Sequence, residues 1–171
     1  MKTILFLLLL TPIIGFSQKT EVYVKLTDPK GVQIKGESTL KGFERWIAAT
    51  SINSGGKNNT VVTFTMPVTG ASADLKRALA NGELLLNGQI TVLSGSQTGG
   101  SPVTSYIIKM ENISVTSCAE AMGCNSAMNT TVTLQATRIG WIYYQTDRTG
   151  VQVVSKKFGW DADAQTEWTN F

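Results

Sequence analysis

The sequence lacks the side chains on which most nucleophilic and zinc chemistry depends. It contains no histidine, so a nucleophile would need a lysine or a carboxylate as its base. Acidic residues are scattered, except for Asp161, Asp163 and Glu167, which we interpret as a solvated tail rather than as coupled carboxylates. With two cysteines and no phosphate-binding glycine motif, we expect no catalytic, metal-binding or cofactor-binding residues.

The first residues have the pattern of a cleaved secretory signal peptide. Lys2 precedes an unbroken apolar run from Ile4 to Leu10, and small residues surround a cleavage position after Ser17. Because the run is shorter than the roughly 20 residues that span a bilayer, a retained membrane helix is the weaker interpretation. We expect residues 1–17 to be removed, which leaves residues 18–171 as one exported domain, periplasmic or secreted and not inserted in the membrane.

The charge of that domain is nearly balanced. Removing the signal peptide takes away one lysine, so 14 basic residues face 12 acidic ones, a net charge of +2. This balance is too even to predict binding to nucleic acid or to an anionic membrane.

Export would determine the oxidation state of the only two cysteines in the sequence. Cys118 and Cys124 would meet an oxidising compartment, and the five residues between them, including Gly123, can close a small loop. We predict a disulfide between them, which by chain entropy contributes roughly 2 kcal/mol at best and holds one loop rather than the fold. The alternative is a pair of unpaired loop cysteines.

Most of the chain alternates apolar and polar residues with the period of a half-buried strand. The apolar sets include Val22, Val24 and Leu26, then 62, 64 and 66, then 132, 134 and 136. Further strands are expected within 89–93, 106–115, 139–145 and 151–155, with a bulge or bend near Asn112. The composition and spacing therefore predict a mainly β domain.

One segment has helical rather than strand spacing. Leu75, Ala78 and Leu79 share one helical face, Ser72 is a candidate cap, and Gly82 follows as a stop signal. Residues 147–150 have the composition of a hairpin turn. We therefore expect one short helix among the strands.

The four tryptophans allow two interpretations. They stand at positions 46, 141, 160 and 168, and packing in the core and at the barrel ends explains them most simply. A stacking platform for a sugar or a nucleobase is the alternative.

Several segments together resemble the haemolysin-coregulated protein (Hcp) family, the tube proteins of type VI secretion. The segment GESTLKGFERWI at 36–47 contains Gly-Glu-Ser and then Lys-Gly-x-Glu-x-Trp, and the resemblance continues through VVTFTMPV, SADLKRALANG, RIGWIYYQTDRTG and KKFGWD. It covers nearly all of the chain after the signal peptide. The family pattern commonly has Asp where this chain has Leu40, and His where it has Phe43.

The resemblance implies a non-enzymatic protein with a β-barrel of two packed antiparallel sheets and one short flanking α-helix. It also implies head-to-tail assembly into a hexameric ring, with protein cargo in the lumen or other secretion components as partners. The loop at 31–42 would reach an adjacent subunit, and Trp46 would anchor the strand behind it. The assembly residues expected from this resemblance are Gly36, Glu37, Ser38, Lys41, Gly42, Glu44 and Trp46.

Export leaves a second function open. Tube subunits of this family are loaded in the cytoplasm, which an exported copy would already have left. The alternative is an exported binding module that keeps the barrel, recognises a surface glycan or protein through its tryptophans and loops, and takes no part in a tube.

Overall fold

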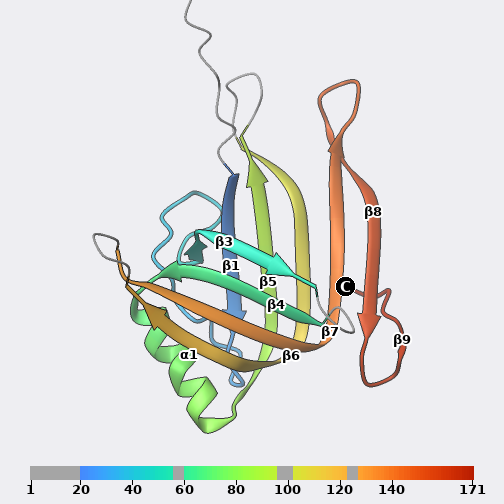
Figure 1. Cartoon of the computed structure of the whole chain (residues 1–171). Coiled ribbons are helices and arrows are strands. Elements are labelled where there is room, and N and C mark those ends of the chain that lie inside the picture. Colours follow the sequence, from blue (N-terminus) through green and yellow to red (C-terminus); the bar gives the residue numbers. More distant parts are fainter. Residues whose placement is uncertain (1–19, 56–59, 96–101, 123–126) are drawn as a thin grey trace, which may run out of the picture.

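The computed structural model describes residues 20–55, 60–95, 102–122 and 127–171, and these ranges confirm a mainly β chain with one short helix (Figure 1). The expected signal peptide and Cys124 lie outside the described residues. The elements are, in chain order, β1 (Thr20–Thr27), β2 (Ile47–Ala49), β3 (Ser51–Ser54), β4 (Val61–Pro67), α1 (Gly70–Asn81), β5 (Leu84–Ser94), β6 (Val103–Ala121), β7 (Asn129–Thr146), β8 (Gln152–Asp161) and β9 (Thr166–Glu167).

The strands form one antiparallel sheet that closes on itself. Hydrogen-bonded neighbours follow the order β2-β1-β5-β6-β7-β4-β3, and only Thr50 separates β2 from β3 along the chain. The segment 47–54 therefore pairs with β1 through β2 and with β4 through β3. The Thr50 N–H also donates to the Thr65 carbonyl oxygen, at 2.7 Å. This closure makes the predicted barrel, because it pairs strands that would be edges of a flat sheet.

The long strands β6 and β7 bend where they pass from one layer of the barrel to the other. In β6 the buried face changes phase between Met110 and Ile113, and Asn112 between them has a φ of 50°. In β7 it changes in the same row, between Ala136 and Ile139. The register runs through this row without a shift, so the predicted irregularity is a bend rather than an inserted residue. Each of these two strands therefore contributes one half to one layer and its other half to the second layer (Figure 1).

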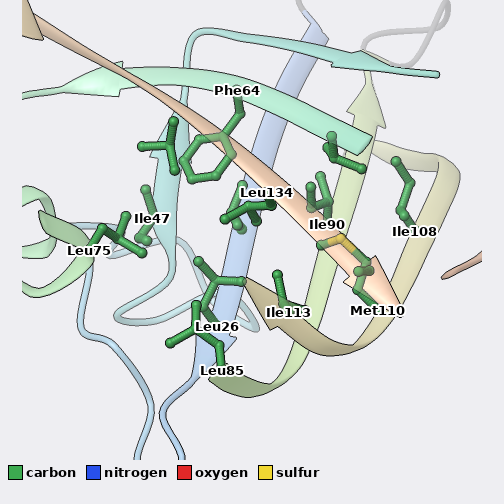
Figure 2. Close-up of a cluster of buried hydrophobic side chains, with 14 of the residues drawn as sticks. Leu26, Ile47, Phe64, Leu75, Leu85, Ile90, Ile108, Met110, Ile113 and Leu134 are labelled. Carbon is green, nitrogen blue, oxygen red and sulfur yellow. The ribbon is translucent and has the colours of Figure 1, made fainter. Parts of the chain in front are cut away.

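The core lies between the two layers. The apolar residues predicted from alternation in β1, β4 and β7 are buried there. Figure 2 shows three of them, Leu26, Phe64 and Leu134, among side chains from α1, β5 and β6. Fully burying one such aliphatic or aromatic side chain contributes about 1.5–3 kcal/mol. The largest fully buried side chains include Leu26, Phe64, Met66, Leu75, Leu85, Ile90, Ile108, Met110, Ile113, Leu134 and Ile139.

The helix α1 covers one end of this core. The sequence suggested Ser72 as its cap, but the helix begins at Gly70 and Ser72 lies in its first turn. There the Ser72 Oγ accepts a hydrogen bond from the Thr69 N–H at 3.2 Å and lies 2.9 Å from the Thr130 Oγ1. The predicted end is confirmed, since Gly82 follows with a φ of 62°. None of the helices in the described ranges is long and apolar enough to cross a membrane.

The last residues fold back over β7 and β8. Gly140 and Gly159 face each other across these strands, and the Phe171 ring occupies the space that their Cβ atoms would need, since a Cβ on either would come closer than 3.0 Å to it. The Lys157 Nζ donates to the Phe171 main-chain oxygen at 2.8 Å and lies 4.1 Å from its ring centroid. The Trp168 ring packs beside it, 4.7 Å between centroids. The absence of side chains at Gly140 and Gly159 therefore leaves the space in which the Phe171 ring packs.

Candidate assembly surface

The loop between β1 and β2 is held by its own backbone hydrogen bonds. The Gly36 N–H donates to the Arg45 carbonyl oxygen at 2.8 Å, the Ser38 N–H to that of Trp46 at 3.0 Å, and the Arg45 N–H to that of Ser38 at 2.7 Å. A Cβ on Gly36 would lie closer than 3.0 Å to backbone atoms of Trp46 and Ile47. Glycine at position 36 is therefore required by the loop's own packing.

The tip of this loop turns at Gly42, whose φ of 88° favours glycine. The Glu44 carboxylate accepts a hydrogen bond from the Gly42 N–H at 2.9 Å. Backbone N–H groups, first that of Glu44 and then that of Gly42, lower the pKa of the Glu44 carboxyl. Lys41 and Glu37 point to solvent, and Leu40 is 37% exposed. The tip is therefore an ordered projection with both charges and an apolar side chain available.

Phe43 attaches this loop to the barrel wall. Its ring stacks on Tyr23 of β1 with 4.8 Å between centroids, and its edge meets Trp46 at 5.1 Å. The Lys25 Nζ lies over the Trp46 ring, 5.8 Å from the centroid. Phe43, which stands where the family pattern commonly has histidine, is thus an internal anchor. Its contacts account for that departure without any partner chain.

The expected assembly residues fall into two groups. Glu37, Lys41, Gly42 and Glu44 are exposed, as a contact surface requires. The remaining three are half-buried and hold the loop together: Gly36, Ser38 and Trp46. The structure brings all seven residues into one loop, and a contact with another subunit stays a prediction.

Sequence reasoning did not single out a second exposed surface, the outer edge of β8. Within the described chain β9 pairs with β8 only at Trp160 and Asp161, so β8 has no strand on that side from residue 152 to 158. Apolar side chains are exposed along this hairpin at Tyr143, Val151, Val153, Val154 and Phe158. The sequence around these residues has the alternation of an ordinary strand. Only the pairing of all strands in the sheet shows that this edge of β8 is open.

Asp161 is a structural residue at the base of that hairpin. Its carboxylate accepts hydrogen bonds from the Ala164 N–H at 2.9 Å and from the Arg138 Nε at 2.6 Å. These two donors, in that order, lower the pKa of the Asp161 carboxyl. Arg138 also contacts the Glu111 carboxylate at 3.2 Å. The interpretation of Asp161 as part of a solvated tail is therefore wrong, whereas Asp163 and Glu167 are exposed.

Cys118 lies half-buried in β6, where burial raises the pKa of its thiol. Because Cys124 lies outside the described residues, the disulfide between them stays a prediction.

The chain was compared with known proteins. A family model described as "Type VI secretion system effector, Hcp" matches residues 23–143. The solved structure of Hcp1 from Salmonella typhimurium is similar, with a TM-score of 0.70 and 18% identity over 87% of this chain and 99% of that one. Hcp1 from the E. coli EAEC 042 pathovar gives a TM-score of 0.67 and 20% identity over 83% and 99%.

The secreted protein Hcp3 from Pseudomonas aeruginosa is also similar, with a TM-score of 0.64 and 19% identity over 81% of this chain and 98% of that one. None of the curated protein sequences matches. At these identities the structural likenesses show a common fold, including the barrel and the single flanking helix.

Proposed function

Because the chain belongs to the Hcp family of type VI secretion proteins, which are structural and non-enzymatic, we propose that it is an exported subunit that assembles head-to-tail into a hexameric ring. The ring would accept protein cargo or other secretion components in its lumen. The signal peptide expected at 1–17 supplies the route of export. Assembly would then follow export, which removes the need for cytoplasmic loading.

The open edge of β8 is the observation that carries this proposal. An edge with unpaired backbone groups and exposed apolar side chains invites pairing with another chain, and stable proteins cover or interrupt such edges. Lys156 and Lys157 discourage uncontrolled pairing along it, but Val153, Val154 and Phe158 remain 37–54% exposed. A neighbouring subunit in a closed ring would cover this edge in every copy.

The loop at 31–46 provides a second contact for the same assembly. Its base is held by internal hydrogen bonds and by the stacking of Phe43 on Tyr23, so little ordering is needed when a partner binds. Its exposed tip combines Leu40 with the charges of Lys41 and Glu37. We assign this tip to contacts between stacked rings, and the β8 edge to contacts within a ring.

Light scattering coupled to size-exclusion chromatography tests the ring. The mature wild type is expected at six times the mass of one chain. Val154→Glu places a charge on the exposed β8 edge without touching the core and should release monomers. The matched control Leu84→Glu, at a position 57% exposed away from that edge, should leave the ring intact.

Two outcomes would contradict this assignment. A wild-type protein that stays monomeric over the whole concentration range would argue against a ring and favour the exported binding module. A ring that survives Val154→Glu but dissociates with Leu84→Glu would place the interface elsewhere. Lys41→Glu should leave the single ring unchanged and reduce stacking of rings, as seen by electron microscopy.

A further inference from the structure

A cleft of about 310 Å³ lies on the outer face of β1, β5 and β6, beside the C-terminal residues. Its floor is one row of cross-strand neighbours, in which Lys25 faces Gln89 and Gln89 faces Lys109. The same row continues across β7 and β8 as Gly140 and Gly159. Its volume is at the lower end of the range for ligand pockets.

The two halves of this row are occupied differently. Phe171 fills the half formed by Gly140 and Gly159, where there are no side chains. The other half is open, and the rings of Phe171 and Trp168 form its side wall. Because the Lys157 Nζ donates to main-chain oxygens of both Thr169 and Phe171, at 2.9 and 2.8 Å, this wall is held in place.

The open half carries excess positive charge. Lys25 and Lys109 have no carboxylate partner among the described residues, and the Lys25 Nζ lies over the Trp46 ring at 5.8 Å from its centroid. The nearby Glu111 carboxylate is already engaged by Arg138, at 3.2 Å. Gln89 lies between the two lysines in the row, where its Nε2 donates to the Thr91 Oγ1 at 3.1 Å, and Asn87 adds a second amide to the cleft. The cleft is therefore lined by two lysines, two amides, an aromatic wall and one carboxylate, Glu111, which is paired with Arg138.

We propose that this cleft binds an acidic saccharide through a uronic acid residue. The carboxylate would lie between Lys25 and Lys109, as charge-assisted hydrogen bonds favour. The amides of Asn87 and Gln89 can donate to and accept from ring hydroxyls, and the apolar face of the sugar ring would pack on Trp168. This binding goes beyond ring assembly and does not depend on it, because all these groups belong to one subunit.

A single-stranded nucleic acid fits the surface less well. Such a ligand needs a basic groove that follows several phosphates. Here the basic residues that line the cleft are Lys25 and Lys109, which are too few to follow several phosphates. The single carboxylate of a sugar acid matches the limited positive region better.

Isothermal titration calorimetry of the whole purified protein with trigalacturonate tests the proposal. Its methyl ester, which keeps the hydroxyls and removes the charges, is the matched neutral probe. Binding of the acid should exceed that of the ester about tenfold and weaken with added salt. Lys109→Gln should remove most of that preference, whereas the control Lys30→Gln, an exposed lysine of the turn at 28–31 outside the cleft, should keep it.

Variants of the wall test the stacking step. Trp168→Ala should weaken both probes, and Trp168→Phe should retain most of the affinity. The proposal is overturned if trigalacturonate gives no binding heat, if the ester binds equally well, or if Lys109→Gln and Lys30→Gln behave alike. Binding of an oligothymidylate in place of trigalacturonate would also overturn it. Light scattering of the same samples reports the ring separately, so failure of one proposal leaves the other intact.

Discussion

Replacing Phe171 with alanine tests how far the C-terminal residues stabilise the barrel. The Phe171 ring lies against Gly140 and Gly159, 4.7 Å from the Trp168 ring and 4.1 Å from the Lys157 Nζ, measured to ring centroids. An aromatic pair contributes about 0.5–1.5 kcal/mol beyond its buried area. A cation over a ring at an exposed site adds about 0.5–1 kcal/mol.

Loss of these two contacts alone should lower the free energy of unfolding by about 1–2.5 kcal/mol in Phe171→Ala, before any loss of buried apolar area is added. At about 2–4 °C per kcal/mol for a domain of this size, Tm should fall by about 2–10 °C. Thermal denaturation followed by circular dichroism measures this change. Leu84→Ala, at a position 57% exposed away from the β8 edge, is the control and should leave Tm within about 1 °C.

A double-mutant cycle with Gly140→Ala makes the test specific. The three atoms nearest to a Cβ on Gly140 all belong to the Phe171 ring, so Gly140→Ala alone should displace this ring and destabilise the protein about as much as Phe171→Ala. Once the ring is absent, Gly140→Ala should be neutral or stabilising, since alanine restricts the unfolded chain more than glycine. If the effects of Phe171→Ala and Gly140→Ala on the free energy of unfolding are additive, the Phe171 ring does not pack against Gly140 as described.

Three further predictions concern other parts of the chain. Gly36→Ala should lower the stability of the subunit itself by about 1–3 kcal/mol, because its Cβ would overlap backbone atoms of the loop; an unchanged Tm with a lost ring would contradict this. Asp161→Asn should lower Tm at neutral pH, and because the folded-state pKa of this carboxyl is depressed, the difference from wild type should close as the pH falls below about 3.9. A difference that is independent of pH would argue against the ionised pair. Thiol titration of the unreduced protein should find Cys118 and Cys124 unreactive, and two free thiols would exclude the disulfide.

Much of the fold was predictable because it depends on local patterns. Alternation of Val22, Val24 and Leu26 identified β1 and its buried face, since a strand places every second side chain on the same side. Gly82 marked the end of α1 because the left-handed conformation there suits glycine. The motif from Gly36 to Trp46 identified the family and the position of the loop.

The candidate sites were less predictable because they join residues distant in the sequence. Arg138 and Asp161 are 23 residues apart, and only the pairing of β7 with β8 makes them neighbours. Trp168 was noticed as one of four tryptophans, but no local pattern could place it at the same cleft as Lys109. Phe43 departs from the family pattern, and its stacking on Tyr23 is visible only in the folded chain.

The amino-acid sequence was sufficient for the class of fold, the single helix, the family and the absence of histidine chemistry, because these depend on composition and short periodic patterns. Strand pairing in the folded chain decided which edge stays open, which carboxylate is buried, and which half of a five-strand row is filled by Phe171. The physical reason is that a residue's neighbours across a sheet are set by the register of strands far apart in the chain, and local alternation says which face a side chain occupies but not what lies beside it.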